Sequence, residues 1–522
     1  KGTGAGTSGP IGSVAIGSKS LKALTTGVAN TAVGFESGVL LTTGGYNAVL
    51  GYQALSNDTD GTDNVAIGWK AGRNVHGAQK NVMIGYQAMA NIDNNPGDEI
   101  ANSVAIGYQA FLGSDNNTTG TTTDANGTVA IGQTALKALT TGQQNTAVGY
   151  QALSVMTELD SNTAVGYQAL KLASGSAGGG NNVAIGAVAG AAITSGEYNI
   201  MIGSRANGQA TSANGNIAVG YFAGWNTRSG SFNTMIGEQS GYQFQNGGDS
   251  NNSFNTYLGA QSGYNNKLGA YNTYIGGNAG KGSGANSNSS NTGVGFDALK
   301  LITTAVENTV VGASAGAAIT TGNGNALLGH NAGTSLNIGS ANIGIGEGAL
   351  PTDDVGKGSV AIGKGSLQGQ NIAGASEVLT KNVGIGYQPL YYNVTGLRNV
   401  AIGYRSQFGA SAQSHDDNTS IGSNALYAIT TAADNTVVGS AAGAALTSGA
   451  SNVFIGKGAG ETPTTALRSI LIGATAGANL TAGVAINAVI AIGYGALTGT
   501  GTQTADINHT IAIGTSTLAN LE

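Results

Sequence analysis

The sequence predicts an all-β protein, a parallel β-solenoid or β-roll of about 28 coils, and three observations support this prediction. A short phrase in which Ile, Val or Leu precedes Gly returns 28 times. Of the 27 spacings between these glycines, 18 equal 17 residues and the other nine are longer, from 19 to 25. The residues before each glycine are mostly Val, Ile, Thr and Ala, which favour short strands. Spacings that equal a fixed minimum or exceed it are typical of a structural coil with insertions. We therefore expect one continuous repeat array over residues 1–522.

The composition excludes several other classes of protein. Glycine makes up 89 of 522 residues, against a usual share of ~7%, while proline is limited to 5, so the chain is neither collagen nor a proline-rich linker. The apolar share of 40% is normal, which argues against disorder. The net charge is −6 and the sequence has no basic stripe, so no nucleic-acid partner is expected. Cysteine is absent, and no apolar run approaches the ~18 residues of a membrane-spanning helix, so no membrane insertion by this segment is expected.

One coil is numbered here so that the recurring glycine occupies position 5. Position 1 is Asn in 21 coils, and stacked coils are expected to align these amides into a hydrogen-bonded ladder. Glycine at position 5 and Ala or Ser at position 8 allow a tight corner. The predicted ladder includes Asn30, Asn47, Asn64, Asn145, Asn162 and Asn182.

Positions 2 to 4 are predicted to form the strand of each coil. Position 4 is apolar in all coils, so it is assigned to the core. Position 3 is then expected to face the other way, because side chains alternate along a strand. It is also mainly apolar, and a strand that is apolar on both faces needs a second cover, most simply another copy of the chain. The core assignment covers Val33, Ile67, Ile84, Val148 and Val165.

The repeated phrase resembles known fibre proteins. "NTAVGYQAL", at residues 145–153 and 162–170, resembles the glycine-rich repeats of phage tail fibres and related bacterial fibres. "NVAIG", at residues 64–68 and 399–403, is similar to the heads of trimeric autotransporter adhesins, which have a shorter coil. The resemblance implies a homotrimer on a virion tail or an extracellular or cell surface, with a host glycan or protein as receptor.

An aromatic residue occupies position 6 in 12 coils. Such a stripe could stack on sugar rings of a cell-surface glycan, or its rings could stack on one another between coils. The stripe follows the repeat rather than one locus, which favours stacking between coils. The possible glycan-facing members are Tyr52, Trp69, Tyr86, Tyr108, Tyr150 and Tyr167.

Few residues suggest metal or catalytic chemistry. Asp58, Asp60 and Asp63 are a weak calcium candidate, because clustered carboxylates suit this ion, although the spacing is not that of an EF-hand and favours a solvated turn. The four histidines lie far apart in the sequence and at different coil positions. We therefore expect no enzyme activity, no cofactor and no other metal site. A polysaccharide depolymerase with a site between protomers is the least favoured alternative.

The nine longer spacings contain insertions between position 9 and the next position 1, so they are expected to emerge from one edge of the solenoid. Loops on a rigid scaffold often carry binding function, although tolerated surface variation explains any single loop equally well. The insertions lie near residues 89–103, 111–127, 171–181, 241–254, 281–291, 367–381, 407–417, 478–488 and 498–509.

The sequence thus favours a structural and adhesive fibre that displays loops or a tip to a host-surface receptor. The alternative is a self-assembling extracellular filament or matrix protein whose units stack end to end. That alternative follows from the two ends of the array, neither of which has the polar cap that a solenoid needs.

Overall fold

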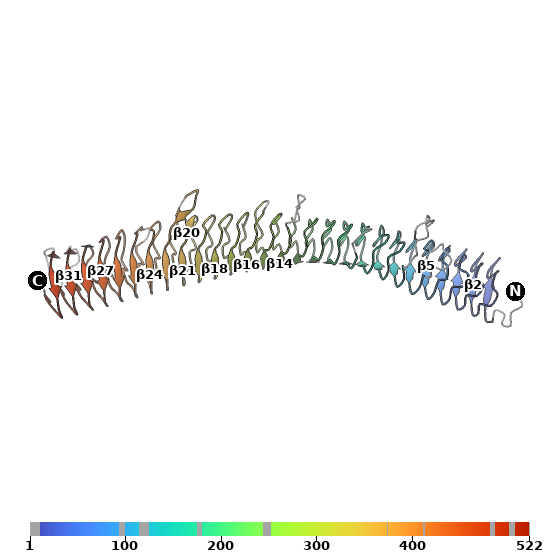
Figure 1. The fold of residues 1–522 in the computed structure, drawn as a ribbon, viewed down its shortest axis with the longest axis horizontal. Coiled ribbons are helices and arrows are strands. Elements are labelled where there is room, and N and C mark those ends of the chain that lie inside the picture. The colour runs from blue at the N-terminus through green and yellow to red at the C-terminus, as the bar shows by residue number, and fades with distance from the viewer. Residues whose placement is uncertain are drawn as a thin grey trace. The chain divides into compact units, whose positions relative to one another are not determined.

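The computed structural model describes residues 11–92, 100–113, 125–174, 180–243, 252–284, 286–372, 374–410, 413–480, 486–500 and 507–520. These residues form strands, turns and bends, and no α-helix is found among them. The chain divides into two compact units, Lys1–Leu268 and Gly269–Glu522. Each unit is a parallel β-solenoid (Figure 1), so the predicted all-β solenoid with a period of about 17 residues is confirmed.

In the first unit each coil contributes one three-residue strand to a parallel sheet. The strands are β1 (Val14–Ile16), β2 (Thr31–Val33), β3 (Ala48–Leu50), β4 (Val65–Ile67), β5 (Val82–Ile84), β6 (Val104–Ile106), β7 (Val129–Ile131), β8 (Thr146–Val148), β9 (Thr163–Val165), β10 (Val183–Ile185), β11 (Ile200–Ile202), β12 (Ile217–Val219), β13 (Thr234–Ile236) and β14 (Thr256–Leu258).

The second unit repeats this sheet and adds short strand pairs on a second side of the coil. Its main strands are β15 (Thr273–Ile275), β16 (Thr292–Val294), β17 (Thr309–Val311), β18 (Ala326–Leu328), β19 (Ile343–Ile345), β21 (Val360–Ile362), β23 (Val383–Ile385), β24 (Val400–Ile402), β25 (Thr419–Ile421), β26 (Thr436–Val438), β27 (Val453–Ile455), β29 (Ile470–Ile472), β31 (Ile490–Ile492) and β33 (Ile511–Ile513). The short strands are β20 (Gly356–Lys357) with β22 (Val378–Leu379), and β28 (Ala466–Leu467) with β30 (Ile486–Asn487) and β32 (Ile507–Asn508).

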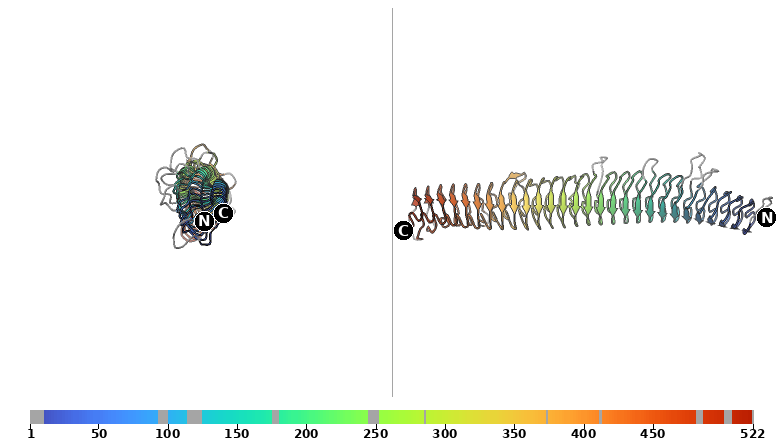
Figure 2. Two further views of the ribbon diagram at one scale, coloured as in Figure 1. Left: turned by 90° about the vertical axis from the view of Figure 1, so that its right-hand side faces the viewer. Right: turned by 60° about the horizontal axis from the view of Figure 1, so that its bottom comes forward.

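Equivalent positions of successive coils stack directly on one another. Strands β8 and β9 pair in parallel, with Ala147 opposite Ala164 and Val148 opposite Val165. The other adjacent strands within each unit pair in the same register, and their arrows point the same way in Figure 2. A residue type that recurs in the sequence therefore becomes a continuous row in the structure.

The corner after each strand requires glycine at position 5. Gly149 has a φ of 135°, in the region that favours glycine, and a Cβ there would lie 2.4 Å from the carbonyl oxygen of Gly166 in the next coil. Positions 7 and 9 also have positive φ, as Gln151 (56°) and Leu153 (50°) show. Three left-handed residues in five turn the chain sharply and bring the next wall back over the strand.

The asparagines at position 1 lie inside the coil and form the predicted ladder. The Asn47 Oδ1 accepts hydrogen bonds from the backbone N–H and the side-chain amide of Asn64, both at 3.0 Å. The Asn47 amide also donates to the carbonyl of Gly61 at 2.8 Å, which closes its own coil. Each buried amide thus links two coils and fastens the two ends of one coil.

The structure corrects the predicted direction of the strand side chains. Position 3 points inward, and Ala32, Ala66 and Ala147 are fully buried. Position 4 points outward, and Ile67 is 36% exposed. The core assignment was therefore wrong for Val33, Ile67, Ile84, Val148 and Val165, which are half-buried or exposed. The reason is alternation: position 1 is fixed inside by the ladder, so position 3 shares its side and positions 2 and 4 do not.

Residues at positions 3 and 9 share the narrow interior and complement each other in size. Where position 3 is Ala, as at Ala147 and Ala164, position 9 can be a buried Leu such as Leu153. Where position 3 of the next coil carries a large side chain, position 9 is Gly. For example, a Cβ on Gly72 would lie 2.5 Å from the Sδ of Met83. Because Leu153 and Gly72 have similar φ values, 50° and 59°, volume rather than backbone conformation selects glycine there.

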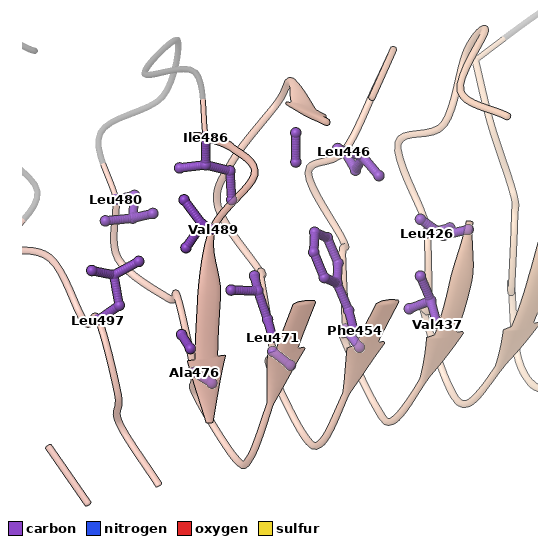
Figure 3. Close-up of a cluster of buried hydrophobic side chains, with 14 of the residues drawn as sticks. Leu426, Val437, Leu446, Phe454, Leu471, Ala476, Leu480, Ile486, Val489 and Leu497 are labelled. Carbon is purple, nitrogen blue, oxygen red and sulfur yellow. The ribbon is translucent and has the colours of Figure 1, made fainter. Parts of the chain in front are cut away.

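The end of the second unit shows this packing directly. In Figure 3 the strand residues Val437 and Phe454 point across the coil toward Leu426 and Leu446, respectively, on the opposite wall. A Cβ on Gly460, beside Phe454, would lie 2.8 Å from the aromatic ring. The core is thus a thin single layer, with one strand side chain per coil.

This complementarity predicts a compensating pair of substitutions. Gly72→Leu alone overpacks against Met83 and is expected to cost about 1–3 kcal/mol of local stability. Met83→Ala alone leaves a cavity and is expected to cost about 2–5 kcal/mol. The double variant reproduces the native arrangement of Leu153 and Ala164, so it is expected to lie within about 1 kcal/mol of wild type. Hydrogen exchange of peptides from this coil measures the local opening free energy, and additive losses in the double variant would refute the shared-volume account.

Candidate functional site

The outward face of the main sheet is the most extensive candidate surface in each unit. It consists of positions 2 and 4, where the sequence has only Thr, Val, Ile, Leu and Ala, without a single charge or amide. Leu50 is 49% exposed, and Ile200 and Ile202 are each 37% exposed. Each such side chain is partly shielded by the same position in the coils on either side. The result is an uncharged and largely apolar strip, called the apolar strip below, of the kind that marks an interaction surface.

An aromatic stripe at position 6 borders this apolar strip. Trp69 stacks on Tyr86 with ring centroids 4.5 Å apart, and Tyr86 stacks on Tyr108 at 5.1 Å. Tyr150 and Tyr167 form a second stack at 5.4 Å. The predicted stacking between coils is confirmed, and it has a consequence for binding: the interior rings of a stack, such as Tyr86, present only their edges to a ligand.

Next to this stripe, position 7 supplies polar ladders. The amide of Gln168 donates to the Oε1 of Gln151 at 2.8 Å, and Gln109 donates to Gln87 at 2.9 Å. The ammonium of Lys70 lies 4.0 Å from the ring centroid of Trp69. These groups are committed to neighbours along the coil stack. The glycan-facing role for Tyr52, Trp69, Tyr86, Tyr108, Tyr150 and Tyr167 therefore lacks the free ring face that sugar stacking needs at the interior positions.

The three aspartates of the calcium candidate do not form a site. Asp58 is buried inside the coil, whereas Asp60 and Asp63 lie exposed outside it. Among the described residues, no group of three or more His, Cys, Asp or Glu side chains could hold a metal ion. The alternation of inward and outward residues separates carboxylates that are close in sequence.

Asp58 instead stabilises a turn. Its Oδ1 accepts a hydrogen bond from the backbone N–H of Gly61 at 2.9 Å. Burial raises the pKa of this carboxyl to about 7, although the Gly61 hydrogen bond opposes the rise. Asn393 occupies the same place in a later coil and accepts from the N–H of Gly396 at 3.1 Å. A neutral side chain therefore satisfies the turn equally well.

The histidines and the insertions contribute no assembled site in the described part of the chain. His415 is buried and burial lowers its pKa to about 4, so it stays neutral at physiological pH. His330 and His509 are exposed in different coils. Parts of the nine predicted insertions, namely residues 93–99, 114–124, 175–179, 244–251, 285, 373, 411–412, 481–485 and 501–506, lie outside the described residues.

A scan against models of known protein families gave no match, and no curated protein is similar in sequence. Across the described ranges, no helix has the length and apolarity needed to cross a membrane.

The buried Asp58 predicts a specific pH dependence. In the unfolded chain this carboxyl ionises near pH 4, and in the folded chain near pH 7. Because the folded pKa is higher, its contribution to stability is fully present below pH 4 and is lost as the pH rises through 7. The full difference corresponds to on the order of 4 kcal/mol. Asp58→Asn should therefore be more stable than wild type at pH 8 and similar to it at pH 4.

Thermal melting at pH 4 and pH 8, combined with hydrogen exchange of the coil around Asp58, measures this effect. Asp63→Asn is the matched control, because Asp63 is exposed in the same segment, whereas the charge of Asp60 itself raises the pKa of Asp58. An Asp58→Asn variant that is no more stable than wild type at pH 8, or that exceeds wild type only as much as the control does, would contradict the buried neutral carboxyl.

Proposed function

We propose that this chain forms the shaft of a homotrimeric adhesive fibre, a phage tail fibre or a bacterial surface adhesin, that presents binding surfaces to a host-cell glycan or protein. The observation that carries the proposal is the apolar strip at positions 2 and 4, which is free of charge in all 28 coils. The fold supports it because a parallel solenoid repeats this strip at the same place on every coil.

The energetic argument rests on repetition. Removing apolar surface from water contributes about 25 cal/mol per Å². A single coil exposes only parts of two side chains, so each contact is weak, but identical contacts add along the stack. An interface between two identical stacked surfaces also keeps the same register from coil to coil. Association of parallel copies through this strip is therefore strongly favoured over leaving it in water.

The resemblance of the repeats to tail fibres and trimeric adhesin heads supports three copies and a place on a virion or cell surface. A shaft of this kind works by geometry. Weak contacts displayed repeatedly on a stiff scaffold give high overall avidity for a surface that carries many copies of one receptor. The corner glycines and the asparagine ladder supply the stiffness, because the glycines pack closely against the next coil and the asparagines hydrogen-bond to it.

Sedimentation equilibrium of the full chain tests the proposal. The expected species has three times the chain mass of 51.2 kDa and does not grow with concentration. Replacing the outward residues Ile67, Ile202 and Ile345 by Glu places charges in the strip and should yield monomers with an unchanged circular dichroism spectrum. The control carries Glu at Gln151 and Gln168, outside the strip, and should remain trimeric.

Other outcomes would overturn the proposal. A monomeric wild-type chain would remove the reason for the apolar strip. Filaments that lengthen with concentration would support the alternative of end-to-end stacking. A charged-strip variant that remains trimeric would place the interface elsewhere.

A further inference from the structure

A surface hollow in the second unit lies at the end of an aromatic ladder. Its volume is about 400 Å³. The hollow is on the turn that follows the corner glycine, so it lies outside the apolar strip. Its lining includes Arg405, Asn424, Tyr427, Ala441, Ala444 and Glu461.

The hollow exists because a run of aromatic residues at position 10 stops. Tyr391 stacks on Phe408 with ring centroids 5.2 Å apart, and Phe408 stacks on Tyr427 at 5.2 Å with an interplanar angle of 1°. In the next coil position 10 is Ala444, which cannot continue the stack. Phe408 therefore covers one face of the Tyr427 ring, and the other face looks into the hollow above Ala444.

The height of the hollow suits one saturated ring. Backbone hydrogen bonds of 2.9 Å, from Ala428 to Ala444 and from Ala445 to Glu461, connect the three successive coils. The Tyr427 and Glu461 coils are therefore separated by roughly 9–10 Å, which is twice the ~4.8 Å spacing of neighbouring strands. A ring in van der Waals contact, about 3.5–4 Å above Tyr427, leaves roughly 5–6.5 Å to the coil of Glu461.

The polar side chains around the hollow include one neutral, one negative and one positive group. Asn424 offers an amide, Glu461 a carboxylate and Arg405 a guanidinium. The Arg405 guanidinium lies 4.9 Å from the Phe408 ring centroid and 5.2 Å from that of Tyr404, and its Nε donates to the Oε1 of Gln388 at 3.1 Å, so three contacts hold it in place. One positive and one negative group balance each other, which favours a neutral ligand rich in donors and acceptors.

We propose that this hollow binds a neutral saccharide unit, with the apolar C–H face of the sugar ring on Tyr427 and its hydroxyls on Asn424, Glu461 and Arg405. The proposal rests on the proposed adhesive function and specifies the receptor class as a glycan. It also separates two kinds of aromatic residue on this protein. Interior rings of a ladder, such as Tyr86, serve the stack, and a ring that ends a ladder beside a hollow is available to a ligand.

The experiment applies the full chain to an array of immobilised bacterial and mammalian oligosaccharides and then titrates the strongest hit by calorimetry. Tyr427→Ala removes the stacking face and should weaken binding at least 10-fold. Ala444→Tyr continues the ladder by the same stacking that Phe408 uses, so it should fold normally and abolish binding by filling the hollow. Tyr427→Phe keeps the face and should retain affinity within about threefold.

Tyr86→Ala is the matched control, because Tyr86 is 41% exposed but is covered on both ring faces, and the affinity of this variant should equal that of wild type. If no oligosaccharide binds, or if Ala444→Tyr binds as wild type does, the site is refuted. If the chain is a trimer and both Tyr427→Ala and Ala444→Tyr bind oligosaccharides as well as wild type does, this site is refuted while the adhesive fibre remains supported. A monomer that binds through Tyr427 would refute the trimeric shaft while supporting the site.

Discussion

The buried asparagine ladder is the interaction on which the rest of this structure depends. An amide inside a coil must have its donors and acceptor satisfied, and the ladder asparagines achieve this with the position-1 residue of the neighbouring coils, usually Asn and in some coils Ser, and with the closing turn of their own coil. This requirement fixes the register of the stack. It also fixes position 1 on the inside, which places position 3 in the core and positions 2 and 4 on the surface. The apolar strip that we propose as the trimer interface is thus a consequence of the ladder.

A coil this narrow leaves little freedom elsewhere. The corner glycines approach the next coil so closely that a Cβ would meet backbone oxygen, and the interior admits either a large strand residue or a large residue at position 9. Apart from the insertions after position 9, variation between coils is therefore concentrated in two places: correlated changes of volume inside and substitutions on the outward walls. The aromatic ladders belong to the second kind, and the place where one of them stops creates the hollow beside Tyr427.

Much of the fold could be predicted from the sequence because repetition converts each residue type into a row. The period, the parallel strands, the Asn ladder and the stacked position-6 rings all follow from this. The orientation of the strand side chains was predicted wrongly, because the Ile, Val or Leu found at position 4 of every coil is typical of a core residue. The Asn at position 1 indicates the correct orientation, because the ladder places it inside the coil and position 3 lies on the same side of the strand. The left-handed backbone at Leu153 could not be predicted, because an isolated L-residue rarely adopts it. The hollow was missed because position-10 aromatics occur in only two short runs of coils.

Replacement of a single rung of the ladder tests the central claim most directly. Asn64→Ala leaves the buried amide N–H of Asn81 without its acceptor, a hydrogen bond of 3.0 Å, at a cost of about 1–3 kcal/mol. Hydrogen exchange of the flanking coils should then accelerate roughly 10- to 100-fold. Asn64→Ser should have a smaller effect, because Ser103 naturally fills a rung and accepts from the N–H of Thr128 at 3.2 Å. Equal exchange in wild type and Asn64→Ala would contradict the claim that the ladder holds the coils together.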